Sequence, residues 1–135
     1  MEFTKLSMAA GVLLAVAAVT LAAASLLHFG VAIPLGGTTI SDPFAGAAIP
    51  EAVIAVVVAA GAVAALARLP LARWLAPAAT LFALAGTLYG LTVTLRRGEA
   101  GDIAYHLTLL TMLVASGALQ LAAHRAGART RPGGA

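Results

Sequence analysis

Four long runs of apolar residues, separated by short polar segments, dominate the pattern of this chain; they cover residues 6–27, 49–67, 75–95 and 103–123. A helix rises 1.5 Å per residue, so each run reaches or approaches the roughly 30 Å of a bilayer's hydrocarbon core. The second run is the shortest. We expect its helix to begin near Ile49 or Pro50 and to end at Arg68, whose side chain snorkels to the interface. The pattern predicts four transmembrane helices.

The first run also has a feature of signal peptides, because Ala22-Ala23-Ala24 resembles a small-residue cleavage site. However, the run is longer than a typical signal-peptide core, and it continues beyond that site. We therefore interpret it as a first span that is retained in the mature protein.

The segment between the first two runs, residues 29–50, contains Pro34, Pro43 and Pro50, which forbid one continuous helix. Gly36-Gly37 lies between two short apolar stretches and predicts a tight hairpin turn. Asp42 followed by Pro43 is typical of a helix N-cap and first helical residue, so a short helix is predicted over 42–48.

Composition supports a membrane environment, since 61% of the residues are hydrophobic and 10% are charged. Soluble domains usually carry about 25% charged residues. The predicted fold class is an all-α membrane protein, a four-transmembrane-helix up-down antiparallel bundle with a 22-residue outer loop between helices 1 and 2. Residues 1–125 form one domain in this interpretation, and residues 126–135 form a disordered basic tail.

Basic residues predict the orientation. In an up-down bundle both termini share one side, and that side holds six of them: Lys5, Arg68, Arg73, Arg125, Arg129 and Arg131. Only Arg96 and Arg97 lie on the other side. The positive-inside rule therefore places both termini in the cytoplasm. The Ala-, Gly- and Arg-rich composition is typical of a bacterial protein, so we expect the inner (plasma) membrane. The basic residues lack aromatic interleaving, which favours the lipid bilayer over nucleic acid as their partner.

Ionisable residues from three different predicted helices fall at a similar depth near the outer side, namely His28, Glu51 and His106. Such groups are costly at membrane depth and usually face a bundle interior or a wet cavity. Two imidazoles and a carboxylate suit zinc, copper or non-haem iron, and His28 with His106 suits the axial positions of a haem. Cysteine is absent, so thiolate ligands and disulfide chemistry are excluded.

Three further residues complete the predicted outer pocket: Tyr89, Asp102 and Tyr105. Asp102 lies four residues before His106 and is therefore placed to orient its ring. Each polar residue also has an ordinary structural explanation. Glu51 suits a helix first turn, Asp102 suits an N-cap, and His28 and Tyr105 suit the membrane interface. Because no metal motif is present, the sequence requires no cofactor, and we favour the structural explanation.

Small and hydroxyl residues recur along the last two predicted helices. Gly86 and Gly90 form a small-xxx-small pattern that permits close helix approach, within the chain, in a homo-oligomer or with a membrane-complex partner. Thr80, Thr87 and Thr94 recur every seven residues. A second stripe contains Thr108, Met112, Ser116 and Gln120. These stripes suit either a pore lining or hydrogen bonds to neighbouring helices, and we favour the latter.

Three functional hypotheses follow, and we favour the first. It is a non-catalytic membrane subunit or scaffold, and so not an enzyme. The second is a small oligomeric transporter or channel, and the third is a metal- or haem-binding membrane protein with a site at the outer face. In size and span count the chain resembles the small multidrug resistance transporters, but its first apolar run has no acidic residue to act as their coupling site. It also shares its span count with the vitamin K epoxide reductases, whose cysteines it lacks.

Overall fold

A computed structural model describes residues 2–129 of the chain. They form four helices, α1 (Glu2–His28), α2 (Ala45–Leu66), α3 (Ala72–Arg97) and α4 (Ala100–Arg129), and a hairpin of β1 (Ile33–Leu35) and β2 (Thr38–Ile40). All four helices are long and apolar enough to cross a membrane. The prediction of an all-α protein with four candidate membrane spans is confirmed at this level.

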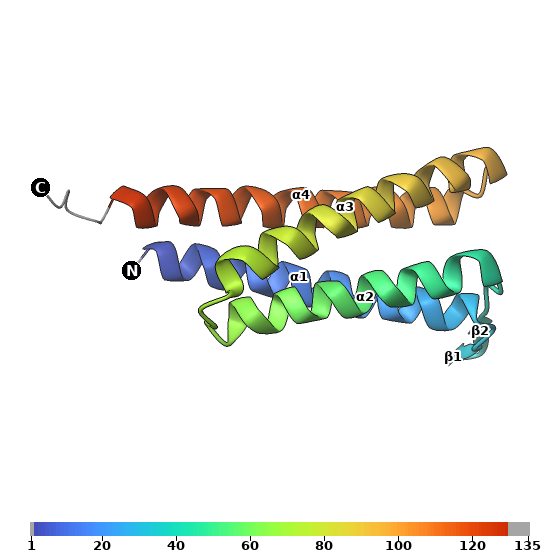
Figure 1. Cartoon of the computed structure of the whole chain (residues 1–135). Helices are drawn as coiled ribbons and strands as arrows, with labels where there is room; N and C mark the ends of the chain where they lie inside the picture. The colour runs from blue at the N-terminus through green and yellow to red at the C-terminus, as the bar shows by residue number, and fades with distance from the viewer. Residues whose placement is uncertain (1, 130–135) are drawn as a thin grey trace, which may run out of the picture.

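The helices pack as a closed ring in which each contacts two others. α1 contacts α2 and α4, and α3 contacts the same two helices. Figure 1 shows the first and last described turns at one end, hereafter the terminal end. The β hairpin and the α3–α4 connection lie at the other, hereafter the hairpin end. Residues at opposite ends of the sequence, in α1 and α4, therefore line the same interior.

Small side chains dominate the core, which lets the helices approach closely. Near its middle, each helix contributes a fully buried residue to one core cluster, and we call these four residues the central apolar layer. Its members are Leu14, Val58, Ala83 and Leu113, each 0% exposed. The predicted close approach at Gly86 and Gly90 has a specific form. A Cβ at Gly86 would collide with the side chain of Ile54 on α2, and one at Gly90 with the ring of His106 on α4.

The connection between α1 and α2 is shorter than the predicted loop. The helix begins at Ala45, so the short helix predicted over 42–48 and the second span form one continuous element, and the loop covers 29–44. Phe44, rather than Asp42, occupies the N-cap position; its carbonyl accepts hydrogen bonds from the N–H groups of Ala47 and Ala48. Pro50 lies inside α2, as its sixth residue, and supplies no N–H for the hydrogen bond to the carbonyl of Gly46.

The predicted hairpin turn is present. β1 and β2 pair antiparallel, with Ile33 opposite Ile40 and Leu35 opposite Thr38. Gly36 and Gly37 form the two-residue turn with φ of 50° and 101°. Both values are positive, as this kind of turn requires, and glycine adopts them without the steric cost that a side chain adds.

The ends of α4 differ from expectation. The helix begins at Ala100, so Asp102 lies in its first turn and is not its N-cap. Helical hydrogen bonding can start earlier because Gly98 ends α3 in the left-handed conformation and allows a sharp reversal. At the other end α4 extends to Arg129, into the segment predicted as a tail. Residues 130–135 of that predicted tail lie outside the described residues.

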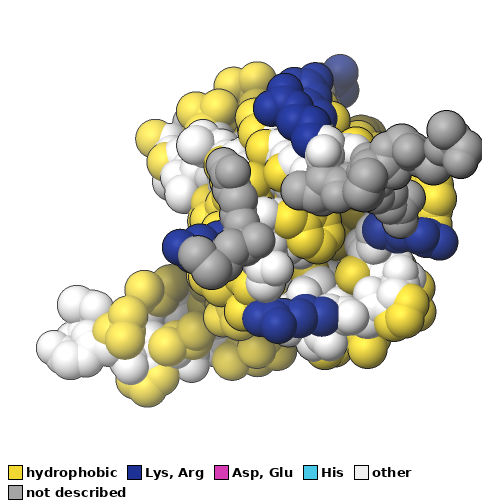
Figure 2. Space-filling model, turned by 90° about the vertical axis from the view of Figure 1, so that its left-hand side faces the viewer, with side chains coloured by type: hydrophobic (Ala, Val, Ile, Leu, Met, Phe, Trp, Pro, Cys, Tyr) yellow, Lys and Arg dark blue, Asp and Glu magenta, His cyan; other side chains and the backbone are white. Residues whose placement is uncertain are grey.

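The terminal end is basic and hollowed. Lys and Arg side chains gather there in Figure 2, which views the molecule from that end. An open cleft of about 1470 Å³, the terminal-end cleft, lies among α1, α4 and the α2–α3 connection. Its lining includes four arginines: Arg68, Arg73, Arg125 and Arg129.

Candidate functional site

A cavity of about 270 Å³ lies inside the bundle at the hairpin end, and we call it the hairpin-end cavity. All four helices and the residue before α2 contribute to its wall. The six residues that the sequence analysis places in an outer pocket all line it: His28, Glu51, Tyr89, Asp102, Tyr105 and His106. Tyr89 is at the rim, because 72% of its side chain is exposed.

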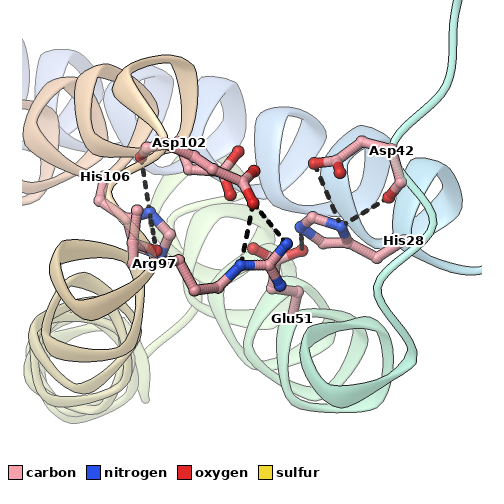
Figure 3. A network of polar contacts seen from close by, with 8 residues as sticks. His28, Asp42, Glu51, Arg97, Asp102 and His106 are labelled. Atoms are coloured by element: carbon pink, nitrogen blue, oxygen red, sulfur yellow. Dashed lines mark hydrogen bonds and ion pairs between the residues drawn. The ribbon is translucent and has the colours of Figure 1, made fainter.

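His28 connects the end of α1 to the start of α2. Its ring lies between two acidic residues, as Figure 3 shows. On one side Nδ1 lies 2.9 Å from the backbone oxygen of Asp42 and 3.6 Å from a carboxylate oxygen of the same residue. On the other side Nε2 lies 3.4 Å from Oε2 of Glu51. The side chains of His28 and Glu51 are 8% and 9% exposed, so the pair is buried.

These contacts require a shared proton. A backbone carbonyl only accepts, so Nδ1 of His28 carries a hydrogen and donates it to Asp42. In a neutral ring, Nε2 is then a bare lone pair, and it faces the carboxylate of Glu51. Two acceptors at this distance repel in a buried setting. One proton placed on either Nε2 or Oε2 removes the repulsion, and the pair then has no net charge.

His106 is held differently from the predicted arrangement. Its Nδ1 donates to the backbone oxygen of Asp102 at 2.8 Å and has Oγ1 of Thr94 at 3.5 Å. The carbonyl of Asp102, rather than its carboxylate, therefore orients the ring. The opposite edge of the ring lies over Gly90, where a Cβ would come within 2.5 Å of Nε2. Tyr105 packs edge-on against the same ring, with centroids 4.9 Å apart.

Three buried polar atoms on the cavity wall have no hydrogen-bond partner: Oε2 of Glu51, Oγ1 of Thr87 and the hydroxyl of Tyr105. They come from α2, α3 and α4. Leaving a buried polar group without a partner costs about 1–3 kcal/mol. Because all three border one cavity, a ligand or water inside it is the natural partner for the group.

Phe44, which lines the cavity, is stacked against an arginine outside the lining. The guanidinium of Arg97, at the end of α3, lies 4.0 Å from the ring centroid of Phe44. Its Nε and Nη2 atoms also donate to Oε1 of Glu99, at 3.1 and 2.7 Å. The ring of Phe44 in turn meets His28 edge-on at 5.9 Å. Arg97 is therefore neutralised by Glu99 while its flat face covers Phe44.

The three predicted metal ligands are not arranged around one point. Within residues 2–129, no group of three His, Cys, Asp or Glu side chains could hold a metal ion. His28 directs its two nitrogens to opposite sides, and the Nδ1 atom of His106 is engaged by the helix backbone. The nitrogen left for a metal or a haem iron is therefore Nε2 on each ring; it faces Glu51 in His28 and the backbone of Gly90 in His106.

A second polar network lies toward the terminal end, and it is satisfied internally. Gln120 donates through Nε2 to Oγ1 of Thr80 at 2.9 Å and to Oγ of Ser116 at 3.1 Å. Ser116 donates to the backbone oxygen of Ala10 at 3.1 Å. These residues are buried and connect α1, α3 and α4. The stripes containing Thr80 and Gln120 thus serve helix packing at this level.

Sequence reasoning missed two residues of the cavity wall, Phe44 and Thr87, and two residues that contact the wall from outside it, Asp42 and Arg97. Asp42 was interpreted as a helix cap, and Phe44 and Arg97 were given no role at the site. Thr87 was noted only as a member of a seven-residue repeat. That repeat was the available signal, because Thr80, Thr87 and Thr94 share one buried face of α3. The positions of Phe44 and Arg97 depend on how the loop meets the end of α3, which no local pattern specifies.

Comparison with known proteins gave no match. No family model matches the chain, and no curated protein or solved structure is significantly similar to it. The function must therefore be argued from the cavity, its charges and its relation to the membrane, because a four-helix fold alone is compatible with many functions.

Proposed function

We propose that the protein is a non-catalytic subunit of a membrane complex in a bacterial inner membrane. It is an up-down four-helix bundle with a cavity for a small ligand at its outer face. The observation that carries this proposal is the hairpin-end cavity. It has three unpartnered buried polar atoms on its wall, and it is separated from the other end of the bundle. A scaffold without a ligand has no need for such orphaned groups in its core.

The orientation rests on charge. The basic side chains Arg68, Arg73, Arg125 and Arg129 line the terminal-end cleft, whereas the carboxylates Glu51 and Asp102 line the hairpin-end cavity. Cytoplasmic loops are enriched in Lys and Arg, so the terminal end faces the cytoplasm and the hairpin end faces outward in this proposal.

The packing favours binding over conduction. The hairpin-end cavity and the terminal-end cleft share no lining residue among the residues described. The central apolar layer lies between them, and its four members line neither space. Opening a water path across this layer requires separating closely packed helices. The chamber is accordingly a closed pocket reached from one side.

The hydrogen bonds favour a non-catalytic role. The hydroxyl of Thr94 lies 3.5 Å from Nδ1 of His106. Because that Nδ1 carries the hydrogen donated to Asp102, it has no lone pair with which to take a proton from Thr94. The pair therefore lacks the base that activates a hydroxyl nucleophile.

A proton-coupled transporter is a second candidate, favoured by the buried His28–Glu51 pair. A proton shared between an imidazole and a carboxylate at membrane depth is typical of coupling sites. In that case the central apolar layer must open during the transport cycle.

Orientation and conduction are tested separately. The natural chain has no cysteine, so single cysteines at exposed Ser41 and Leu71 report the two ends without background. In intact cells we expect a membrane-impermeant maleimide to label Ser41→Cys and to label Leu71→Cys only after lysis. The reverse pattern contradicts the proposed orientation. In liposomes we expect no flux of protons or small cations above that of protein-free vesicles. Proton-coupled flux would contradict the subunit proposal and support the transporter.

A further inference from the structure

Resting on the proposed ligand chamber, we infer that the hairpin-end cavity binds a small primary ammonium ion, R–NH3⁺, in exchange for the proton that His28 and Glu51 share. The inference stands on the number of unpartnered acceptors, the charge of the wall and the size of the space.

The acceptors match the ligand's donors in number. A primary ammonium group has three N–H donors and no acceptor. The wall has three buried oxygens without a hydrogen bond, on Glu51, Thr87 and Tyr105; that of Glu51 faces Nε2 of His28 at 3.4 Å. Glu51 and Thr87 are 6% and 3% exposed, so bulk water does not satisfy them from outside. An ammonium group can donate one hydrogen to each oxygen. A carboxylate ligand could accept from the hydroxyls of Thr87 and Tyr105, but it would meet the Glu51 carboxylate as a second acceptor of the same charge.

The charge of the surroundings also favours a cation. The titratable and charged groups around the Glu51 carboxylate come from every neighbouring element: His28 from α1, Asp42 from the loop, Arg97 from α3, and Asp102, Tyr105 and His106 from α4. Arg97 is compensated by Glu99 through two hydrogen bonds. When the proton of the His28–Glu51 pair leaves, the carboxylates exceed the remaining cations, and a bound ammonium restores the balance.

The size of the cavity limits the ligand. At the roughly 30 Å³ that one water occupies in the liquid, a cavity of about 270 Å³ has room for roughly nine non-hydrogen atoms. This volume lies at the lower end of small-molecule sites, which start at about 300 Å³. Below the polar groups, the wall includes Leu21, Ile54 and Leu109, which suit an alkyl chain of a few carbons.

The exchange conserves charge and protons. An ammonium ion enters, one proton leaves from the His28–Glu51 pair, and no covalent bond other than that to the proton is changed. Glu51 then accepts a hydrogen bond from the ligand, while Nδ1 of His28 keeps its bond to Asp42. Binding must consequently weaken as the pH falls, because the proton competes for the same carboxylate.

Calorimetry on the full chain in detergent micelles tests the inference. The probe is n-butylammonium chloride, with butyrate, butanol and tetramethylammonium as comparisons. We expect n-butylammonium to bind with release of about one proton, measured from the heats in two buffers of different ionisation enthalpy. Tetramethylammonium lacks N–H donors and should bind at least tenfold more weakly, and butyrate should not bind.

Variants assign the binding to this wall. Glu51→Gln should lower n-butylammonium affinity at least tenfold and abolish proton release, and Thr87→Val should lower it several-fold with release retained. Thr92→Val is the matched control on α3; its hydroxyl is exposed and bonds the carbonyl of Tyr89, so affinity should not change. If Glu51→Gln does not fold, the affinity of Thr87→Val and the number of protons that the natural chain releases still test the inference.

The outcomes separate this inference from the proposed function. Binding of butanol as tight as that of n-butylammonium, or binding of n-butylammonium without proton release, overturns the ammonium exchange while leaving a ligand chamber in place. Absence of binding by all four probes, together with unchanged or raised stability of Thr87→Val, shows a cavity that holds only water and removes both the inference and the proposed function.

Discussion

The imidazole of His106 on α4 occupies the space that a side chain at Gly90 on α3 would need, since a Cβ there would lie 2.5 Å from Nε2. The ring cannot turn away easily, because its Nδ1 is bonded to the carbonyl of Asp102 and Tyr105 packs against it. Glycine at this position thus lets α3 and α4 approach closely beside the cavity.

Gly90→Ala should therefore destabilise the bundle by about 1–3 kcal/mol, the usual cost of overpacking a core. Thermal unfolding in detergent micelles measures it. Gly101→Ala is the control, because a Cβ there meets nothing within 4 Å. The double variant Gly90→Ala/His106→Ala should lose less stability than the sum of the two single variants, since the added methyl then enters the space that the ring leaves. Strict additivity would contradict the contact.

The His28–Glu51 pair predicts an asymmetric response to substitution. His28→Ala leaves the buried Glu51 carboxyl without its neighbour and should cost about 3–5 kcal/mol, as expected when one partner of a buried ion pair is removed. Glu51→Gln keeps the shape, and its amide can donate to Nε2 of His28, so the loss should be about 1 kcal/mol. Unfolding of both variants is compared with that of His124→Ala, an exposed histidine near the other end of the bundle.

The order of these two losses is the critical result. Equal losses, or a larger loss for Glu51→Gln, would mean that the pair does not behave as a shared-proton unit. The same outcome would argue against the ammonium exchange, because that exchange requires the His28–Glu51 pair to release a proton when the ligand binds.

The hydrogen bond between Gln120 and Thr80 predicts a measurable coupling between α4 and α3. Thr80→Val and Gln120→Leu should be non-additive by about 0.6 kcal/mol, and by no more than about 1.7 kcal/mol, the range found for hydrogen bonds inside membrane proteins. A double-mutant cycle on unfolding in micelles gives the value. Replacing Thr111 by Val in the same cycle should show no coupling to Gln120, because Thr111 is exposed and bonds its own helix.

The sequence predicts the elements of this fold well and their junctions poorly. The four helices follow from uninterrupted apolar runs, and Gly36-Gly37 specifies the hairpin, because hydropathy and positive φ are local properties. The start of α2 was predicted too late because Pro50 was interpreted as a first-turn residue. Asp42, assigned to a helix cap, instead meets His28, which lies fourteen positions earlier in the chain.

The cavity was predictable only as a set of residues. Depth along the four spans placed His28, Glu51 and His106 at one level, and all three line the same space. Their rotation about each helix axis decides whether they form a ligand triad or separate pairs. That rotation depends on packing, for example on the fit of His106 over Gly90, and the apolar faces here are too uniform to specify it.

The central apolar layer leads to the last prediction, which concerns both stability and permeability. Leu113 is 0% exposed and shares the buried core cluster with Leu14 and Ala83 from the two neighbouring helices of the ring, α1 and α3. Leu113→Ala should lower the free energy of unfolding by about 2–5 kcal/mol, the range for truncating a buried leucine. Leu107→Ala should lower it far less, because Leu107 is 51% exposed. If the layer is also the barrier between the two hollow ends, Leu113→Asn should let water in and raise proton leak through reconstituted vesicles above that of the natural chain. A Leu113→Asn protein that folds and remains as tight as the natural chain would show that the barrier lies elsewhere in the bundle.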